Sequence, residues 1–325
     1  MKNQLFLICM AAVIGMSVSC KKKESEETSA ANVQTQSEVD DQTKQFSEDG
    51  NRYKQVSDEA NDDADAAANS VVSFGRGINS PAATYSSPCG YTIDSSQASQ
   101  KILTLVFDSA TYCLNPSRIR AGKIKVQLTQ GNHWGDANSE LTITFINYRV
   151  IYFINNQPHH IVFNGVKTYQ NVNGVSLDFW LGTAPIIYKE RANSIQVDFE
   201  NGAAHAVWNS ARRITWTYSP QSTDLTLNVN GDSTLNGYAN VDSWGTNRYS
   251  YDFTTYYHTP IVTNTHCWLW RPVSGELVHH VNNNDYILTF GVNPDGSAHS
   301  GDCGYGWKIT WTPAGGSETF VVISY

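Results

Sequence analysis

The sequence has few charged residues and no excess of basic ones. Charged side chains make up 16% of its 325 residues, and the formal net charge is −8 at pH 7. Most of the acidity lies in residues 21–80, and the residues that follow are nearly neutral. Because a protein needs a basic surface to hold a phosphate backbone, this composition argues against nucleic acid as a partner.

The chain also lacks the short motifs typical of common enzyme and metal sites. It contains no G-x-S-x-G nucleophile elbow, no H-E-x-x-H pair and no phosphate-binding Gly-rich loop. Its six cysteines form no C-x-x-C knuckle, which argues against zinc. We therefore expect no catalytic residues, no metal and no cofactor, and interpret the protein as not being an enzyme.

Two patterns in the sequence invite a metal interpretation, and only the second keeps it open. His159-His160 and His279-His280 are adjacent pairs, but neighbouring side chains of a strand point to opposite faces, so neither pair can chelate with both rings. Asp295 and Asp302 flank the Cys303 loop, where carboxylates could hold Ca²⁺. The alternative is that this acidic segment is an ordinary turn.

A pair of carboxylates is what glycoside hydrolysis requires. Asp198 and Glu200 share one face of an expected strand, and Glu190 is expected on a preceding turn. Sequence spacing does not set the distance between these groups. A carboxylate-dependent hydrolase is therefore kept as an alternative function.

The first 19 residues have the pattern of a lipoprotein signal peptide. A positive start precedes an apolar run, Leu5 to Val18, that is too short for a permanent membrane span. Ser17-Val18-Ser19-Cys20 then resembles the lipobox of bacterial lipoproteins, with Met16 and Val18 as departures from its usual pattern. We expect the Cys20 thiol to be acylated, the alternative being an ordinary signal peptide with a stray cysteine.

The residues after Cys20 indicate where such an anchor lies. Two or three acyl chains hold a protein stably on a membrane, so the membrane is an expected partner. Lys21-Lys22-Lys23-Glu24-Ser25-Glu26-Glu27 resembles the export signal of surface-displayed lipoproteins. The expected location is the outer membrane, with exposure at the cell surface; the leaflet and the oligomeric state stay open.

Residues 20–81 are expected to form a flexible acidic tether. Up to about Asn51 almost nothing is apolar, so the segment cannot bury enough surface to offset the entropy of ordering it. Farther on, apolar residues recur near helical spacing, which allows one short helix over 55–72. We interpret this helix as a solvated spacer rather than as a partner-binding element.

Residues 82–325 are predicted to be an all-β domain of antiparallel hairpins. Apolar and polar residues alternate in runs typical of half-buried strands. These runs are Ile102/Thr104/Val106, Ile124/Val126/Leu128, Ile143/Phe145, Ile195/Val197/Phe199, Ile214/Trp216/Tyr218, Leu225/Leu227/Val229 and Ile309/Trp311. No amphipathic stretch of helical length interrupts residues 85–325, which excludes a parallel α/β fold. A β-sandwich is the expected arrangement, with a long open β-meander as the alternative.

Asn-Gly pairs lie between several of these runs. Asparagine and glycine adopt the positive φ angles that tight hairpin turns need. The pairs are Asn164-Gly165, Asn173-Gly174, Asn201-Gly202 and Asn230-Gly231. We expect them to mark hairpin turns.

Two Cys-containing units, similar in pattern, lie at the ends of the domain. Each has one cysteine before a strand and a second cysteine in the loop after that strand. Four cysteines allow three pairings in an exported domain. Because duplicated units should pair alike, we predict the disulfides Cys89–Cys113 and Cys267–Cys303.

Aromatic residues make up 12% of the chain and form alternating rows. The rows are Tyr249/Tyr251/Phe253, Trp268/Trp270 and Trp307/Ile309/Trp311. A row that faces inward forms core, which is the general expectation, whereas one that faces water offers a flat platform for sugar rings or peptide. We predict Trp268 and Trp270 as ligand-binding residues because they share a strand face beside a predicted disulfide.

A set of landmarks spans nearly the whole domain. They are the Cys113 loop with Gly122-Lys123-Ile124, Leu141-Thr142-Ile143-Thr144-Phe145 running into Asn147-Tyr148, Asn164-Gly165, Cys267 with Trp270 and Ser274-Gly275, and Cys303. In these landmarks residues 85–325 resemble a group of β-rich lipoproteins from Gram-negative bacteria. Ser109-Ala110-Thr111-Tyr112 departs from the Gly and acidic residues usual before Cys113, so no ion-binding role is carried over. The group has no assigned activity, and the resemblance implies location and architecture only.

Together these observations favour a lipid-anchored protein of the cell envelope that binds a glycan or an envelope protein. A flexible tether suits such a module because the domain can sample space while the lipid fixes its position. A purely structural envelope component is the first alternative, and the carboxylate-dependent hydrolase is the less favoured one.

Overall fold

The structure is a computed structural model, and it describes most of the chain after residue 35. The described residues are 36–71, 74, 89–114, 117–154, 156–174, 184–220, 224–268, 271–282, 284–301, 303–313 and 316–325. The predicted signal peptide over 1–19, Cys20 and Trp270 lie outside them. No helix formed by the described residues has the length and apolar character needed to cross a bilayer.

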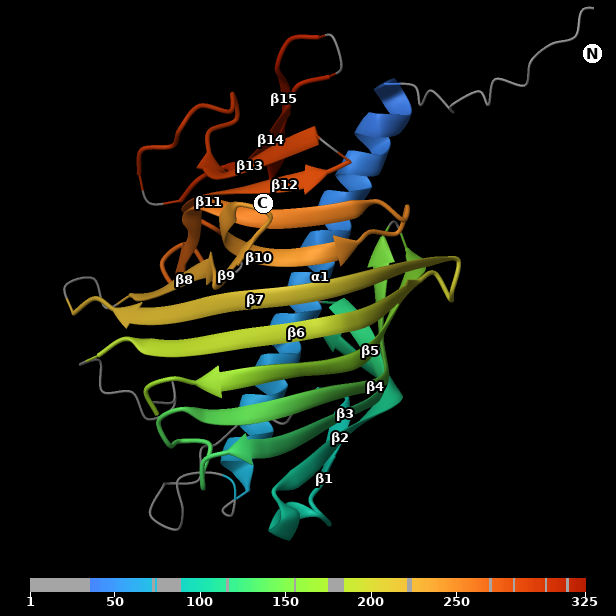
Figure 1. Cartoon of the computed structure of the whole chain (residues 1–325), viewed down its shortest axis with the longest axis vertical. Helices are drawn as coiled ribbons and strands as arrows, with labels where there is room; N and C mark the ends of the chain where they lie inside the picture. The colour runs from blue at the N-terminus through green and yellow to red at the C-terminus, as the bar shows by residue number, and fades with distance from the viewer. Residues whose placement is uncertain are drawn as a thin grey trace, which may run out of the picture.

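Within these residues the chain forms one long helix followed by a succession of strands (Figure 1). The elements are α1 (Gln36–Ser70), β1 (Tyr91–Asp94), the 3-10 turn η1 (Ala98–Gln100), β2 (Ile102–Leu114), β3 (Ser117–Gln130), β4 (Ser139–Ile154), β5 (Gln157–Asn171), β6 (Ile186–Phe199), β7 (Ala204–Tyr218), β8 (Leu225–Gly231), β9 (Ser233–Leu235), β10 (Tyr238–Thr246), β11 (Asp252–Asn264), β12 (Ser274–Val281), β13 (Asn284–Val292), β14 (Gly306–Trp311) and β15 (Thr319–Ser324).

All strands belong to one antiparallel sheet, which confirms the all-β prediction. Its path runs β1-β2-β3-β4-β5-β6-β7-β10-β11-β12-β13-β14-β15, so nearly every strand pairs with its neighbour in sequence. This is the open meander that was the alternative, and the expected sandwich of two sheets is not formed. The sheet packs on α1 instead of on a second sheet. The helix α1 runs behind the strands and crosses most of them (Figure 1). We call the face that packs on α1 the inner face and the opposite one the outer face.

The long helix corrects the prediction of a flexible tether with a short helix over 55–72. Phe46, Tyr53, Ala60 and Ala67 recur every seven residues and are almost completely buried. A repeat of seven keeps one stripe of a helix facing the same partner. Alanine in the second half lets the helix backbone approach the sheet, and aromatic residues fill the wider space in the first half. Residues 36–70 are therefore part of the core rather than a solvated spacer.

The inner face supplies the other half of this core. Tyr53 stacks on Trp208 of β7 with ring centroids 4.6 Å apart, and Phe46 packs on Phe253 of β11 at 5.1 Å. Most of the predicted alternating runs lie in strands, but the first one has its faces reversed. Leu103, Leu105 and Phe107 are buried, whereas Ile102, Thr104 and Val106 are half-buried on the outer face. In that run both faces carry apolar residues, so period two alone does not tell them apart.

The Asn-Gly pairs have mixed outcomes. Asn201-Gly202 closes the β6–β7 hairpin as predicted. Gly165 instead lies inside β5 at a register shift, where Ile195 of β6 approaches within 2.9 Å of the position a Cβ would occupy. Asn236-Gly237, which was missed, forms the two-residue turn between β9 and β10, and both residues have positive φ.

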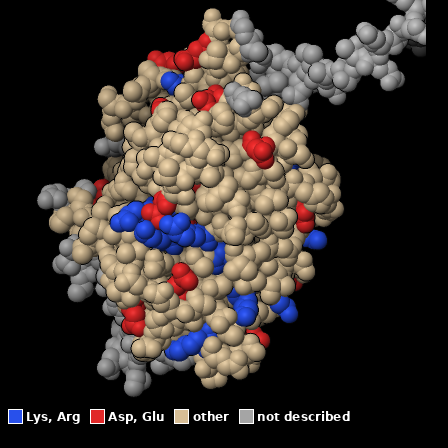
Figure 2. Space-filling view, viewed as in Figure 1, with Lys and Arg blue, Asp and Glu red and all other residues tan. Residues whose placement is uncertain are grey.

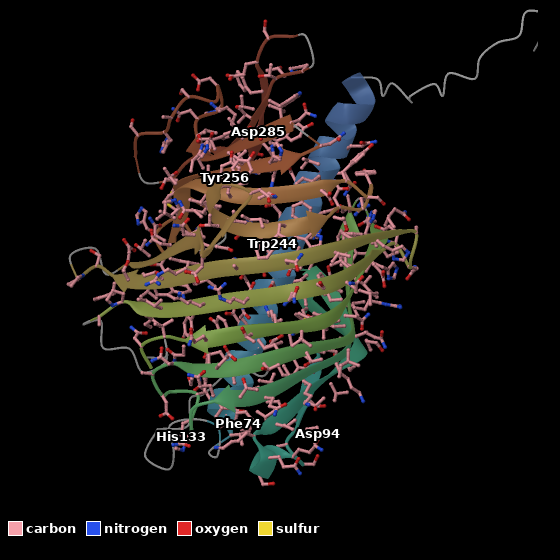
Figure 3. All side chains as sticks on the ribbon, in the orientation of Figure 1. Phe74, Asp94, His133, Trp244, Tyr256 and Asp285 are labelled. Carbon is pink, nitrogen blue, oxygen red and sulfur yellow. A yellow bond between two sulfur atoms is a disulfide. The ribbon has the colours of Figure 1, made fainter. Side chains whose placement is uncertain are left out.

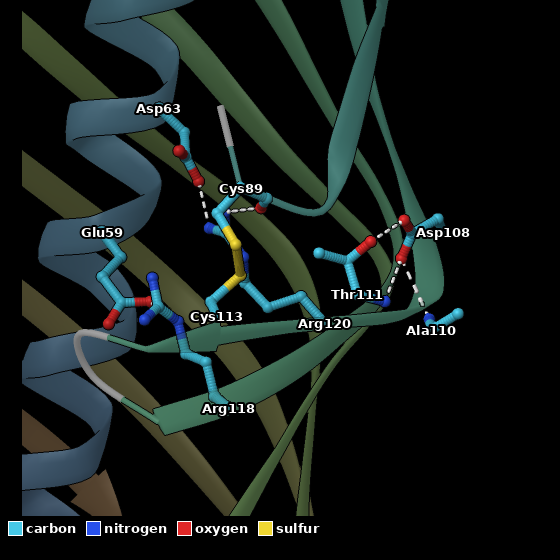
Figure 4. The surroundings of a disulfide bond; sticks show 9 residues. All are labelled: Glu59, Asp63, Cys89, Asp108, Ala110, Thr111, Cys113, Arg118 and Arg120. Atoms are coloured by element: carbon cyan, nitrogen blue, oxygen red, sulfur yellow. Dashed lines mark hydrogen bonds and ion pairs between the residues drawn. A yellow bond between two sulfur atoms is a disulfide. The ribbon is translucent and has the colours of Figure 1, made fainter. Parts of the chain in front are cut away.

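Both predicted disulfides are present, Cys89–Cys113 and Cys267–Cys303, with Cα atoms 5.9 and 5.4 Å apart. The prediction that each second cysteine lies in a loop holds for Cys303 but is wrong for Cys113, which is in β2. Figure 4 shows the first disulfide beside α1, where Arg120 donates a hydrogen bond to the carbonyl oxygen of Cys89 at 2.6 Å and forms an ion pair with Asp63.

Candidate ligand-binding site on the outer face of the sheet

The inner face holds the most deeply buried charges of the molecule. Glu190, expected on a turn, lies in β6 and is completely buried under α1. Lys167 of β5 donates to it at 3.1 Å, and Asn61 of α1 donates at 2.6 Å. Burial alone would raise the pKa of Glu190, but Lys167 and Arg212 lower that pKa to about 2. The group is thus a buried member of an ion-pair network and is ionised at neutral pH.

The other two carboxylates proposed for hydrolysis lie elsewhere. Asp198 is paired with His205 of β7 at 2.5 Å, and Glu200 is paired with His159 at 2.8 Å. Each carboxylate therefore has a partner of its own, and neither joins the network of Glu190. The described residues contain no group of three or more His, Cys, Asp or Glu side chains arranged to hold a metal ion.

The second histidine pair shows how a strand separates two neighbouring rings. His279 points to the inner face, where Thr255 lies 2.7 Å from its Nδ1, and burial lowers its pKa to about 3. His280 points to the outer face and shares a hydrogen bond with Asp285 at 2.7 Å. The first ring is therefore a neutral core residue, whereas the second is accessible from solvent.

Around His280, aromatic rings gather on the outer face. Tyr238 of β10 stacks on Tyr256 of β11 with centroids 4.4 Å apart and planes 18° apart. The ring of His280 lies 5.6 Å from that of Tyr238, and His258 lies 5.5 Å from Tyr256 on the other side. Figure 3 labels Tyr256 on β11 and Asp285 on β13, the strand that pairs with the strand of His280. We call Tyr238, Tyr256, His258 and His280 the aromatic row.

A pocket of about 470 Å³ opens beside this row. Its lining consists of three residues with amide or carboxylate groups, two aromatic residues, one histidine and two small hydroxyl residues. The lining residues are Asn236, Ser250, Tyr251, Asp252, Phe253, Thr254, His280 and Asn282. His280 belongs to both the row and the pocket, so the two form one continuous surface. This is the kind of concave site in which a few polar groups orient a ligand against apolar rings.

The connection from β8 to β10 builds one wall of the pocket. β8 pairs with residues 212–218 of β7, whereas β10 pairs with residues 207–210, so the two strands lie end to end beside β7. The chain between them forms the β9–β10 hairpin, whose Asn236-Gly237 turn reaches the pocket. Two further turns, at Ser250 and Asn282, supply lining residues that, like Asn236, have positive φ.

Trp268 lies in a different environment from the one predicted. It is not on a strand face but in the turn after β11, directly after Cys267, with φ of 68°. Its side chain is 66% exposed. A bulky residue in the left-handed region is strained, and such strain persists only when the surroundings impose it. Here the Cys267–Cys303 disulfide and a hydrogen bond from the Arg271 N–H to the Trp268 carbonyl oxygen, 2.9 Å long, hold the turn.

The pocket residues were missed by the sequence interpretation, although part of the signal was visible. Asn236-Gly237 is an Asn-Gly pair between two polar-apolar runs, which is a strong hairpin signal. The row Tyr249/Tyr251/Phe253 was noted, and the structure divides it: Phe253 is core, and Tyr251 is half-buried in the pocket wall. What brings Tyr238, Tyr256 and His280 together is the register of three strands, which the local pattern does not encode.

Comparisons with protein-family models, with curated proteins and with solved structures found no match to this chain. The resemblance to β-rich lipoproteins therefore stays a prediction.

Proposed function

We propose that this protein is a lipid-anchored binding module of the bacterial cell envelope and that it binds a glycan in the outer-face pocket. The observation that carries the proposal is the continuity of a polar pocket with a stacked aromatic row. Asn236, Asp252 and Asn282 offer hydrogen-bond donors and acceptors suited to sugar hydroxyls. Tyr251 and the row offer ring faces suited to the apolar face of a sugar.

The rigidity of the surface favours binding. Tyr256 and His280 stand on neighbouring strands of the sheet, and His280 is fixed by its hydrogen bond to Asp285. A ligand that meets side chains already held in place loses less entropy on ordering the site. Exposed Trp268 at the other end of β11 is proposed as a second contact, together with Trp270.

The proposed location rests on Cys20 and on the disulfides. Disulfides persist in oxidising compartments, which agrees with export. Labelling cells with a palmitate analogue compares the wild-type chain with Cys20→Ala. We expect label only in the wild type, because only that chain keeps the acylated thiol. Equal labelling of both chains contradicts the lipid anchor.

The binding proposal is tested with the full-length protein on an array of bacterial and host glycans. Tyr251→Ala and His280→Ala each remove one side of the pocket, and each is expected to weaken binding about tenfold. Tyr112→Ala is the matched control because Tyr112 is an exposed aromatic residue of β2, 48% exposed and away from the pocket strands. Trp268→Ala is measured in the same series.

The possible results separate the alternatives. Loss in the two pocket variants with an unchanged control supports the pocket. Loss in Trp268→Ala alone moves the site to the Cys267 turn and contradicts the pocket. No binding by folded wild type to any glycan favours a structural envelope component, and turnover of a glycan contradicts the non-enzymatic proposal.

A further inference from the structure

Basic side chains gather on the outer face and outnumber the carboxylates among them. Lys189 of β6 and Arg213 of β7 are direct cross-strand partners and so share one face. Arg191 lies two residues along β6 on that face. Figure 2 shows Lys and Arg side chains concentrated near the middle of this face. Like charges directly opposite each other destabilise a strand pair, so this placement needs an explanation.

One carboxylate serves this basic group. Asp232 lies between the cations, with Oδ2 3.0 Å from Lys189 Nζ and 2.7 Å from Arg191 Nη2. No acceptor for the guanidinium of Arg213 is found among the described residues. Three positive charges thus face a single negative one, and the surplus is available to an anion from solution.

The neighbouring strands extend the basic group into a row of polar side chains. In register with Lys189 and Arg213 stand Gln170 of β5 and Asn230 of β8. Their amides are suited to hydroxyl groups rather than to a lipid interior. On β4 the row ends at Glu140, opposite Gln170. The row therefore has a cationic centre flanked by amides, which matches a sugar chain that carries an acidic group.

The β9–β10 hairpin connects this basic, amide-flanked row to the pocket. Asp232 stands at the base of the hairpin, and Asn236 lines the pocket at its turn, four residues away. Four residues of extended chain span at most about 14 Å. One oligosaccharide can therefore reach both surfaces.

We propose that Lys189, Arg191 and Arg213 bind the carboxylate of an acidic polysaccharide, a glycan built from uronic acids. This inference rests on the proposed glycan-binding function and specifies the charge of the ligand. In the free protein Asp232 pairs with Lys189 and Arg191, and the ligand carboxylate displaces it from at least one of them. Attraction at this exposed site falls with rising salt because mobile ions screen it.

The test uses oligogalacturonate and its methyl-esterified, uncharged form of the same length as probes for the full-length protein. Wild type is expected to bind the charged form more tightly, and added salt is expected to weaken that binding. Arg213→Gln is expected to weaken binding of the charged form about tenfold and leave the esterified form unchanged. Arg213→Lys keeps the charge and is expected to recover part of the affinity.

Two further variants separate a binding role from a structural one. Asp232→Asn removes the competing carboxylate and is expected to strengthen binding of the charged probe severalfold, which mere loss of structure does not produce. Arg149→Gln, an exposed arginine of β4, is the control. Vesicles containing phosphatidylglycerol test the membrane as an alternative source of the anion, and binding to them in preference to oligogalacturonate contradicts the inference.

Failure of this inference differs from failure of the proposed function. Equal binding of both probes, unchanged in Arg213→Gln, overturns the acidic-ligand inference and leaves glycan binding intact. Absence of binding to these probes, with a neutral glycan bound in the pocket, overturns the inference alone. Absence of any glycan binding by the folded protein overturns both.

Discussion

Arg212 and Arg213 are neighbours in β7, but their side chains lie on opposite faces of the sheet and in different electrostatic environments. The side chain of Arg212 is 3% exposed on the inner face, where Asp58 accepts from it at 2.8 and 3.2 Å and Asp242 lies 3.5 Å away. Arg213 points outward among other cations. A buried charge is tolerated only with partners, whereas an exposed one remains solvated without them. Charges of the inner face thus form ion pairs with α1, whereas those of the outer face are the ones proposed to bind a ligand.

The largest expected effect comes from breaking the inner network. Lys167→Met removes the ammonium that donates to Glu190 and to Ser57 of α1, and it leaves a buried carboxylate with fewer partners. We expect the free energy of unfolding to fall by about 3–5 kcal/mol in urea titrations at neutral pH. Lys125→Met on the outer face is the control and should change it by less than about 0.5 kcal/mol.

A double variant shows whether the loss belongs to the pair. In Lys167→Met/Glu190→Met both charges are gone, so we expect the double variant to be more stable than the sum of the single effects implies. An additive result would mean that the network contributes through packing alone.

The inner network could not be read from the sequence, whereas much of the sheet could. Period-two runs located β3, β4, β6, β7, β8 and β14, and the two similar Cys-containing units predicted both disulfides. Those signals are local alternation and a repeated local pattern. The sandwich was wrong because alternation reports that one face is buried and says nothing about which element covers it.

The helix shows what a local composition signal misses. Residues 36–70 are rich in Asp, Ser and Ala, a composition typical of a solvated segment. Its acids are instead partners of distant arginines, as with Asp58 and Arg212 or Asp63 and Arg120. The stripe from Phe46 to Ala67 begins in the part of the tether, up to about Asn51, that was expected to contain almost nothing apolar. A search for seven-residue spacing of apolar residues over the whole segment could have found the buried stripe of the helix.

For the candidate site on the outer face, the sequence predicted the type of residue but not which residues form it. Exposed aromatic residues were expected, but the pair chosen from the sequence, Trp268 and Trp270, was assigned to a strand that is not formed at Trp268. The aromatic row depends on the pairing of β9, β10, β11 and β12, including a register shift in β10. Such long-range register is set by tertiary packing.

The second largest effect is expected from removing the disulfide next to the Trp268 turn. Replacing both Cys267 and Cys303 by serine frees a loop of 36 residues. The chain-entropy model predicts a loss of roughly 3–4 kcal/mol. Urea unfolding under non-reducing conditions measures it, and reduction of the wild type provides the comparison. An unchanged midpoint would mean that the hydrogen bonds of Arg271 hold this turn without the disulfide.

The inner face should also respond to pH. Burial outweighs the pairing of Asp49 with Arg248 and raises the pKa of Asp49 to about 6; burial likewise outweighs Arg118 and raises the pKa of Glu59 to about 7. Both carboxyls are protonated more readily in the folded chain than in the unfolded one. Their stabilising contribution is therefore present below about pH 4 and is lost as the pH rises through 6 and 7.

We accordingly expect the free energy of unfolding to fall by about 1–2 kcal/mol between pH 5 and pH 8. Glu59→Gln, which mimics the protonated group, should reduce that slope, whereas Glu318→Gln at an exposed position should not. Glu190 has the opposite sign, because its lowered pKa gives stability that is lost as the pH falls toward about 2. A stability that rises steadily from pH 5 to 8 would show that the ion pairs outweigh burial at Asp49 and Glu59.

The smallest effect is expected at Trp268, where strain and exposure coincide. Glycine adopts a φ of 68° without steric cost, so Trp268→Gly should raise the free energy of unfolding by about 1 kcal/mol. Trp268→Ala keeps the strain and should leave stability nearly unchanged. If both variants also lose ligand affinity, the strained turn exists to present the indole, and the loops resemble the outer face in exchanging stability for binding. If Trp268→Gly destabilises instead, the exposed indole contributes packing that outweighs its backbone strain, and this turn belongs with the inner face as a structural element.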